Sequence, residues 1–132
     1  YLTAIDQYKV DVVIRLTGDC PYPSNEIIQT LLKSHFETGA DYTVAKKSAI
    51  GTDPQIFNTT TLKKIRELFP QTDYSEYMNA YVVNNPQYFK INIVDLPSNL
   101  VRNYRLTLDY KEDLDCFREI ERYFHENTPI SH

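Results

Sequence analysis

The segment that most constrains the fold is a run of β-branched and aliphatic residues at positions 10–16. Only Asp11 and Arg15 interrupt it, and Thr17-Gly18-Asp19-Cys20-Pro21 ends it. A nearly continuous apolar run is typical of an interior strand, because a strand that is covered on both faces has no polar side. The run therefore predicts a sheet with other elements packed on both of its faces.

The remaining segments alternate between helical and strand patterns. Ser24 is placed to cap a helix that continues to Thr38, and Gly39 is placed to end it. The expected helices are 1–9, 24–38, 59–69, 75–83 and 111–126, and the expected strands are 10–16, 41–45, 55–57, 88–94 and 105–108. The last helix is expected to bury Leu114, Phe117, Ile120 and Phe124. This order predicts an α/β domain with a mixed, mostly parallel sheet and flanking helices.

No repeat, low-complexity tract or linker divides the chain, so we interpret residues 1–132 as a single domain. The chain begins with Tyr1 instead of Met, and nothing in the sequence caps its first helical segment. We therefore expect it to be the carboxy-terminal portion of a longer domain.

Composition excludes several classes of protein. Lys and Arg total 14 against 18 Asp and Glu, a net charge of −4, whereas proteins that bind nucleic acid or anionic membranes need a basic face. The two cysteines, Cys20 and Cys116, and the three histidines lack the spacing of a zinc site or a disulfide framework. No apolar run approaches the roughly 20 residues of a membrane span, and no secretory signal is visible. We expect a cytoplasmic protein.

Two aspartates follow predicted strands. Asp19 comes after the strand that ends near Leu16, and Asp109 comes after the strand that ends at Leu108. Ligands of open α/β sheets bind beyond the carboxyl ends of strands. Mg²⁺ takes one or two protein carboxylates and completes its coordination with phosphate oxygens and water. If the two aspartates meet in space, they could hold Mg²⁺ against a nucleoside triphosphate.

Simpler structural interpretations of these acids remain open. Asp109 and Glu112 have the spacing of a capping box for the last helix. Asp113 lies where the helix dipole favours an acid, and Asp19 fits a turn. Cys20 is expected to be a small buried side chain and not a nucleophile.

Glycine is rare in this chain, which limits how it can hold phosphate. The three glycines are Gly18, Gly39 and Gly51, so no Gly-rich loop of the P-loop or dinucleotide type can be assembled. Gly18 would let a ligand approach the backbone closely. Arg15 and Arg105 lie within predicted strands, where they either pair with carboxylates or occupy exposed edge positions. An obvious cradle for a triphosphate is therefore absent from the sequence.

The stretch Val-Val-Ile-Arg-Leu-Thr-Gly-Asp-Cys-Pro at 12–21 resembles the strand-and-turn signature of the spore-coat polysaccharide cytidylyltransferases, a group that belongs with the CMP-Kdo and acylneuraminate cytidylyltransferases. Three further stretches, at 40–42, 51–57 and 105–114, occur in the order of that family. The resemblance covers nearly the whole chain. It implies part of a Rossmann-like nucleotide-diphospho-sugar transferase fold.

The resemblance also implies a function. Such enzymes transfer a nucleotidyl group from a nucleoside triphosphate, here CTP, to a sugar or sugar acid for surface polysaccharide synthesis, with Mg²⁺ as cofactor. The implied site residues are Asp19 and Asp109 as catalytic residues and Mg²⁺ ligands, and Thr17, Gly18, Arg105 and Glu76 as substrate-binding residues. Glu76 is the one residue that transfers from the Glu-His-Val-Thr-type stretch of the family.

The chain departs from the family pattern in ways that keep other interpretations open. Residues 22–25 replace an aliphatic pair and Asp-Pro, and the Arg- and Lys-bearing amino-terminal loop of the family is absent. A binding or assembly module that kept the fold and lost catalysis is the alternative. A glycosyltransferase ranks last, because the turn 19–21 lacks an Asp-x-Asp. We expect the chain alone to be inactive, and to form a homodimer that covers the strand at 10–16.

Overall fold

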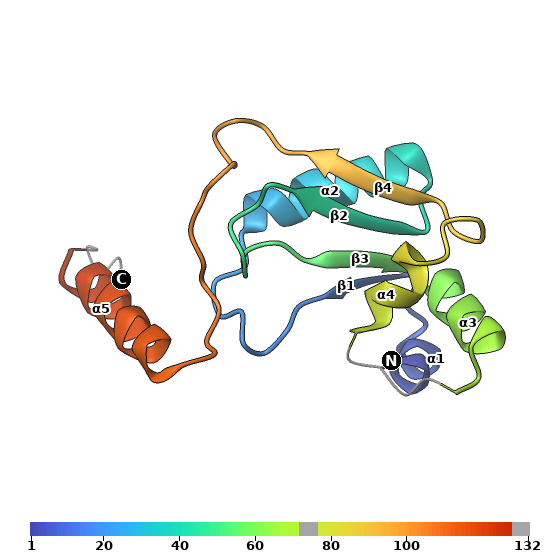
Figure 1. Cartoon of the computed structure of the whole chain (residues 1–132), viewed down its shortest axis with the longest axis horizontal. Helices are drawn as coiled ribbons and strands as arrows, with labels where there is room; N and C mark the ends of the chain where they lie inside the picture. Colours follow the sequence, from blue (N-terminus) through green and yellow to red (C-terminus); the bar gives the residue numbers. More distant parts are fainter. Residues whose placement is uncertain (72–76, 128–132) are drawn as a thin grey trace.

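The computed structural model describes residues 1–71 and 77–127 (Figure 1). Helices and strands are interspersed along the chain, as the sequence predicts, with two strands and then two helices in direct succession near its middle. Their order is α1 (Leu2–Tyr8), β1 (Val12–Arg15), α2 (Asn25–Thr38), β2 (Tyr42–Lys46), β3 (Gln55–Asn58), α3 (Thr59–Leu68), α4 (Met78–Val83), β4 (Ile91–Asp95) and α5 (Lys111–Asn127). None of the helices in these ranges is long and apolar enough to span a bilayer.

The four strands form one mixed sheet in the order β1-β3-β2-β4. Strand β3 pairs antiparallel with both β1 and β2, and β2 pairs parallel with β4. Strands β1, β2 and β4 therefore run in one direction, as predicted, but β3 runs against them. The reason is the connection: the short loop 47–54 between β2 and β3 reverses the chain, whereas parallel neighbours need a crossover of a dozen or more residues.

Helix α2 covers one face of the sheet. The Ser24 hydroxyl accepts a hydrogen bond from the Ile27 N–H, and Gly39 ends the helix in the left-handed conformation with φ 59°, both as predicted. Ile27 and Leu31 pack against Ile56 of β3 in one buried cluster. The apolar stripe of α2 thus supplies one half of the core.

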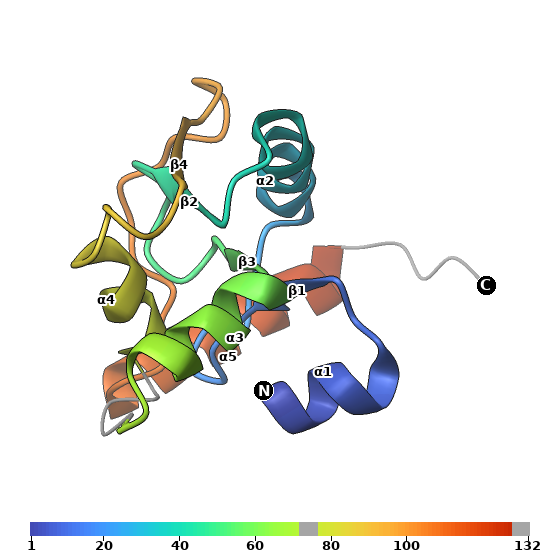
Figure 2. The ribbon, with the colours of Figure 1, turned by 90° about the vertical axis from the view of Figure 1, so that its right-hand side faces the viewer.

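Helices α1, α3 and α4 cover the opposite face, so the sheet lies between them and α2 (Figure 2). Ile5 of α1, Leu62 of α3 and Val82 of α4 belong to a second buried cluster with Phe57 of β3. Successive side chains of a strand point to opposite faces, and Ile56 and Phe57 accordingly join different clusters. Strand β3 is therefore covered on both faces. The prediction that the run at 10–16 forms the interior strand is wrong, because β1 lies at an edge of the sheet and Ile14 is exposed.

A buried histidine ties α2 to the sheet. His35 is 1% exposed, with Nδ1 2.8 Å from Thr43 Oγ1 and Nε2 3.0 Å from Asn58 Oδ1. The Asn58 amide nitrogen donates to the Ala40 carbonyl, so Asn58 Oδ1 is the atom that accepts from His35. Nε2 therefore carries the proton, and Nδ1 accepts from the Thr43 hydroxyl. Both ring nitrogens have hydrogen-bond partners, so the imidazole can be buried without an unsatisfied polar atom.

Replacing His35 by Ala should lower the free energy of unfolding by about 2–4 kcal/mol, because it opens a cavity and leaves buried polar partners unsatisfied. Urea denaturation followed by circular dichroism measures the change. The control is Gln29→Ala, at an exposed position of the same helix, which should change stability by no more than about 0.5 kcal/mol. Equal effects of the two substitutions would contradict this account.

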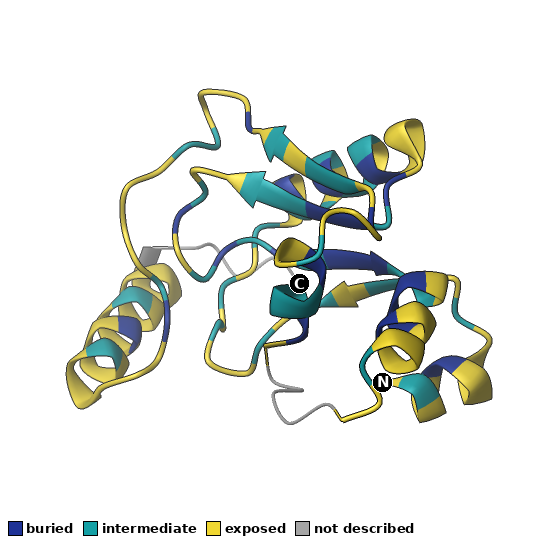
Figure 3. Ribbon diagram, turned by 45° about the vertical axis from the view of Figure 1, so that its right-hand side comes forward, coloured by how far each residue is buried: buried dark blue, intermediate teal, exposed yellow. Residues whose placement is uncertain are grey.

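Helix α5 stands apart from the sheet, at the end toward which β1, β2 and β4 run (Figure 1). Phe117 is 7% exposed, and its ring packs edge-to-face on Tyr22 with the ring centroids 5.3 Å apart. Leu114 and Phe124 are 37% and 60% exposed, so the prediction that they are buried is wrong. The less exposed residues of α5 lie along one side of the helix, and most of the helix is exposed to solvent (Figure 3).

Candidate functional site

An open cleft with a volume of about 920 Å³ lies beyond the carboxyl end of β1. Residues from the two ends of the chain line it together, among them Thr17, Gly18, Asp19 and Asp109. Arg15 and Gln55 also line it, and neither was predicted as a site residue. Arg105 contacts Asp109 directly, and Glu76 lies outside the described residues. The two predicted aspartates therefore meet at one cleft.

Backbone hydrogen bonds bring Asp109 to this position. The Ile50 N–H donates to the Tyr104 carbonyl at 3.1 Å, the Leu106 N–H donates to the Ile50 carbonyl at 2.8 Å, and the Leu108 N–H donates to the Asp19 carbonyl at 2.7 Å. The last of these bonds places residues 108 and 19 next to each other. Asp109 follows immediately, at the rim of the cleft.

The predicted strand at 105–108 is wrong in extent, because the structure forms only an isolated parallel bridge between Ile50 and Arg105. The partner segment explains the difference. Directly after Ile50 the chain turns back, with the Thr52 N–H donating to the Ala49 carbonyl at 3.1 Å. No extended partner is left to continue the ladder.

Gly51 permits the close approach of these two segments. Its φ is +91°, a conformation that side chains rarely adopt, and a Cβ placed there would lie 2.4 Å from the Leu106 carbonyl oxygen. The first residue of the motif Gly51-Thr52-Asp53-Pro54 is therefore a glycine because a side chain would clash there. In the sequence alone, this motif is only part of the resemblance to the family.

Substitution Gly51→Ala should push residues 104–108 away from the loop at 50 and lower protection of the Leu106 and Leu108 amides. Hydrogen exchange read by NMR measures that protection. The control is Gly39→Ala, where φ is also positive, at +59°, but no atom lies within 4 Å of the added Cβ. It should reduce overall stability by about 1 kcal/mol without a selective effect on these two amides. Unchanged protection in Gly51→Ala would contradict the steric argument.

Asp19 lies in the turn after β1, in a setting that favours its ionised form. A hydrogen bond from the Thr17 side chain, assisted by a backbone amide, holds the pKa of Asp19 below its ordinary value. The Thr17 hydroxyl also lies 3.1 Å from Cys20 Sγ. Burial raises the pKa of the Cys20 thiol, so the thiol stays protonated near neutral pH. A raised pKa disfavours the thiolate, which is the reactive form of a cysteine. Cys20 is half-buried, so the prediction that it is fully buried is wrong.

Asp109 is held in place by its neighbours. Its Oδ2 accepts hydrogen bonds from the Thr107 hydroxyl at 2.6 Å and from Arg105 Nη1 at 2.7 Å. The other terminal nitrogen of Arg105 contacts the Asp113 carboxylate. Arg105 thus joins the candidate site residue Asp109 to the first turn of α5.

The capping interpretation of Asp109 is wrong by one position. Helix α5 begins at Lys111, and Asp113 Oδ2 accepts from the Tyr110 N–H at 2.9 Å and from the Asp109 N–H at 3.0 Å. Desolvation opposes ionisation of Asp113, but these amides and Arg105 outweigh it and lower its pKa. Because Asp113 supplies the capping carboxylate in place of Glu112, the Asp109 side chain is directed to Arg105 and Thr107 instead.

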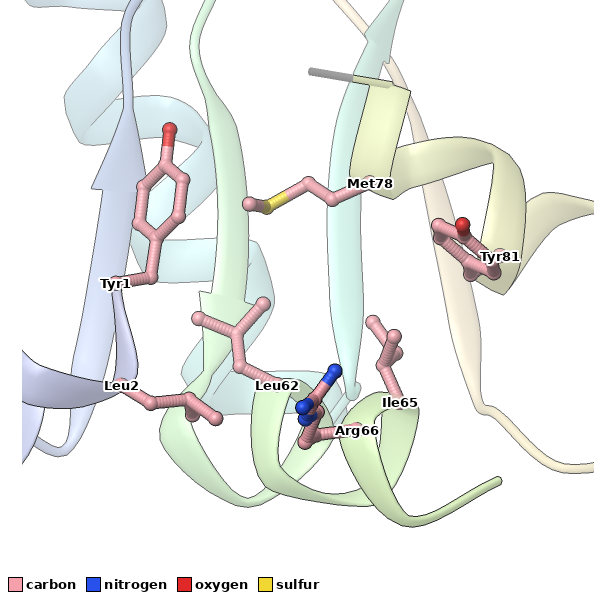
Figure 4. Close-up of a pocket in the computed structure, with 7 residues that line it drawn as sticks. All are labelled: Tyr1, Leu2, Leu62, Ile65, Arg66, Met78 and Tyr81. Carbon is pink, nitrogen blue, oxygen red and sulfur yellow. The ribbon is translucent and has the colours of Figure 1, made fainter. Parts of the chain in front are cut away.

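A smaller pocket of about 150 Å³ lies between α1, α3 and α4 (Figure 4). Its lining is mainly apolar and includes Leu2, Leu62, Ile65 and Met78. Arg66 also lines the pocket and donates a hydrogen bond to the Pro70 carbonyl. This pocket contains no predicted site residue and no carboxylate among the described residues. The cleft at the end of β1 is therefore the candidate site.

The donors in the cleft suit a hard divalent cation. Asp19 and Asp109 are the carboxylates of its described lining, and one or two carboxylates are what Mg²⁺ takes from a protein. In the described ranges no group of three or more His, Cys, Asp or Glu could hold a metal. The oxygen-only pair fits Mg²⁺ better than it fits zinc, which prefers nitrogen and sulfur ligands.

Comparison with known proteins identifies a matching family and several relatives. The sequence profile of the family described as cytidylyltransferase matches residues 1–129. The chain is 29% identical over 133 residues to the spore coat polysaccharide biosynthesis protein SpsF of Bacillus subtilis, with 99% of this chain and 55% of that protein covered. It is 29% identical over 118 residues to an uncharacterised protein of Methanocaldococcus jannaschii, with 89% and 49% covered. The chain thus spans about half the length of the curated relatives it matches.

Solved structures share the fold. A cytidylyltransferase from Leptospira borgpetersenii superposes with a TM-score of 0.74 at 25% identity, covering 100% of this chain and 66% of that one. The molybdopterin-guanine dinucleotide biosynthesis protein A of Archaeoglobus fulgidus superposes with a TM-score of 0.59 at 11% identity, covering 92% and 60%. The second likeness concerns the fold alone.

Proposed function

Because this chain belongs to the cytidylyltransferase family, we propose that it supplies the metal-binding side of a site that transfers a nucleotidyl group from CTP to a sugar or sugar acid. The observation that carries the proposal is the convergence of Asp19 and Asp109 on one cleft. The likeness to a spore coat polysaccharide biosynthesis protein supports a role in surface polysaccharide synthesis. We expect the protein to act in the cytoplasm, where nucleoside triphosphates are available.

The predicted site residues in and beside the cleft that the structure describes each have a physical task in this proposal. Asp19 and Asp109 would hold Mg²⁺, which when bound neutralises charge on the phosphates. The hydrogen bond from Thr17 lowers the pKa of Asp19 and so favours its ionised form, and Arg105 fixes the orientation of Asp109. A Cβ at Gly18 would meet no atom within 4 Å, so its backbone is open to a ligand. These residues bind and orient, and they do not form a covalent intermediate.

In the full-length protein, Asp19→Asn and Asp109→Asn should each lower kcat by about 100-fold or more, because each removes a charge that holds the metal. Pyrophosphate release from CTP with Mg²⁺ and candidate sugars measures the rate. The control is Asp6→Asn in α1, whose carboxylate pairs with Lys63 at 3.0 Å away from the cleft. It should leave kcat unchanged. Full activity in both cleft variants would overturn the proposal.

The 132-residue chain alone should release no pyrophosphate. Its described cleft offers two carboxylates and one arginine, whereas a triphosphate also needs a cradle of amides and cations. The same assay, with chain and full-length protein at equal concentration, tests this expectation. Robust turnover by the chain alone would contradict it.

A binding or assembly module with the same fold is the second candidate. It is favoured by the pairing of Asp109 with Arg105, since an arginine can already balance that carboxylate without a metal. In that case the full-length protein would bind its ligands and show no pyrophosphate release with any triphosphate. The activity measurements above separate the two candidates.

We also propose a homodimer that forms along the open edge of β1. In the described part of the chain β1 pairs only with β3, and the Ile14 side chain is exposed. An open edge offers unpaired backbone groups to a second strand. The substitution Ile14→Lys should shift the protein toward monomer in sedimentation velocity. Ile93→Lys, at an exposed position of the other edge strand β4, is the matched control, and equal effects of both would contradict the assignment to β1.

A further inference from the structure

Helix α5 contacts the rest of the chain along one of its faces. Asp113, Phe117 and Glu121 follow one another at intervals of four residues, so their side chains lie on the same face of the helix. Asp113 contacts the segment before the helix, whereas Phe117 and Glu121 both contact Tyr22. Asp109 precedes α5 by two residues and belongs to no strand of the described ranges. Its position therefore depends on where α5 is anchored.

Tyr22 makes two kinds of contact with α5. Its ring packs edge-to-face on Phe117 with the centroids 5.3 Å apart, and its hydroxyl donates to Glu121 Oε1 at 2.5 Å. The hydrogen bond to Glu121, together with burial, raises the pKa of Tyr22 to about 12, so the phenol remains a donor at neutral pH. Because the two contacts fall on successive turns of α5, they restrict both the distance and the rotation of the helix.

The backbone that carries Tyr22 is itself restricted. Pro21 and Pro23 flank it, and a proline limits both its own φ and the conformation of the residue before it. The segment continues directly into α2, where the Ser24 N–H donates to the Thr52 carbonyl at 2.8 Å. Tyr22 is therefore a fixed point against which α5 is placed.

The two segments that carry the acids of the cleft are thus connected twice. The Leu108 N–H donates to the Asp19 carbonyl at 2.7 Å, and Tyr22, three residues after Asp19, holds the helix that begins two residues after Asp109. A single backbone hydrogen bond in an exposed segment opens readily, because little else has to move with it. The contact through Tyr22 adds a side-chain connection that opposes this opening.

We propose that Tyr22 is a positioning residue, which through Phe117 and Glu121 fixes the place of Asp109 relative to Asp19. Tyr22 does not line the cleft, so it acts through Asp109 and not on a bound substrate. The consequence for metal binding rests on the proposed function, because the separation of the two carboxylates decides how well they share one ion. Groups that orient the ligands of a metal contribute to its affinity in this way.

The test uses the full-length protein and compares Tyr22→Ala with Tyr22→Phe, which keeps the ring and loses the hydroxyl. In Tyr22→Ala the Leu108 amide should exchange its hydrogen about tenfold faster or more, as read by NMR. The amides of β3 should be unaffected, because the sheet has buried clusters of its own. Tyr22→Phe should accelerate exchange of Leu108 less, since the aromatic contact with Phe117 remains.

Metal affinity is the second measurement. Mn²⁺ takes the same oxygen ligands as Mg²⁺, and electron paramagnetic resonance counts the free ion when Mn²⁺ alone is titrated. Tyr22→Ala should bind Mn²⁺ about fivefold more weakly or worse, and Tyr22→Phe should restore part of the affinity.

Tyr8→Ala, at a 71% exposed position of α1, is the matched control and should behave as the wild type in both measurements. If Tyr22→Ala does not fold, Glu121→Ala takes its place, with Glu119→Ala at an exposed position of the same helix as its control. Glu121→Ala should then accelerate exchange of the Leu108 amide, and Glu119→Ala should not.

An unchanged Leu108 amide in Tyr22→Ala overturns the inference. Equal acceleration of all amides also overturns it, because Tyr22 would then stabilise the fold as a whole. Selective exchange at Leu108 with unchanged Mn²⁺ affinity, in a protein whose wild type binds Mn²⁺, contradicts the positioning of Asp109. A wild type that binds no Mn²⁺ would sink the metal proposal instead, and the Leu108 amide alone would then decide the inference.

Discussion

The hydrogen bond from the Leu108 N–H to the Asp19 carbonyl is the contact on which the cleft depends. It joins the turn after the first strand to the segment before the last helix, so two carboxylates that are distant in sequence share one site. The sheet could form without this bond, because β1, β2, β3 and β4 pair through their own ladders. The cleft could not, since Asp109 belongs to no strand that would otherwise place it.

Arg105 sets the electrostatics of this region. One of its terminal nitrogens contacts Asp109 and the other contacts Asp113, so a single cation balances an acid of the cleft and the capping acid of α5. A divalent ion at Asp109 would compete with Arg105 for the same carboxylate. With a metal bound at Asp109, Arg105 could keep its contact with Asp113 in the first turn of α5.

The sequence predicted the features that depend only on neighbouring residues. Ser24 and Gly39 bound α2 as expected, because capping needs only neighbouring residues. Asp19 and Asp109 line one cleft, but the strand expected to place Asp109 forms only a single bridge, so their convergence depends on a long-range backbone contact between residues 108 and 19. The direction of β3, the single bridge at Arg105 and the exposure of Phe124 were not predictable, since they depend on loop length and on packing partners. Arg15 was left ambiguous because a strand pattern does not say which face opens on a cleft.

The tie that places Asp109 is made almost entirely of main-chain atoms. Ile50, Leu106, Leu108 and Asp19 contribute N–H and C=O groups to it, and only Gly51 is required for its small size. Most side chains along these backbone contacts can therefore be substituted without moving Asp19 and Asp109. We therefore expect distant relatives to keep these backbone contacts even where most side chains differ. A glycine at the position of Gly51 would be the sequence feature that identifies them.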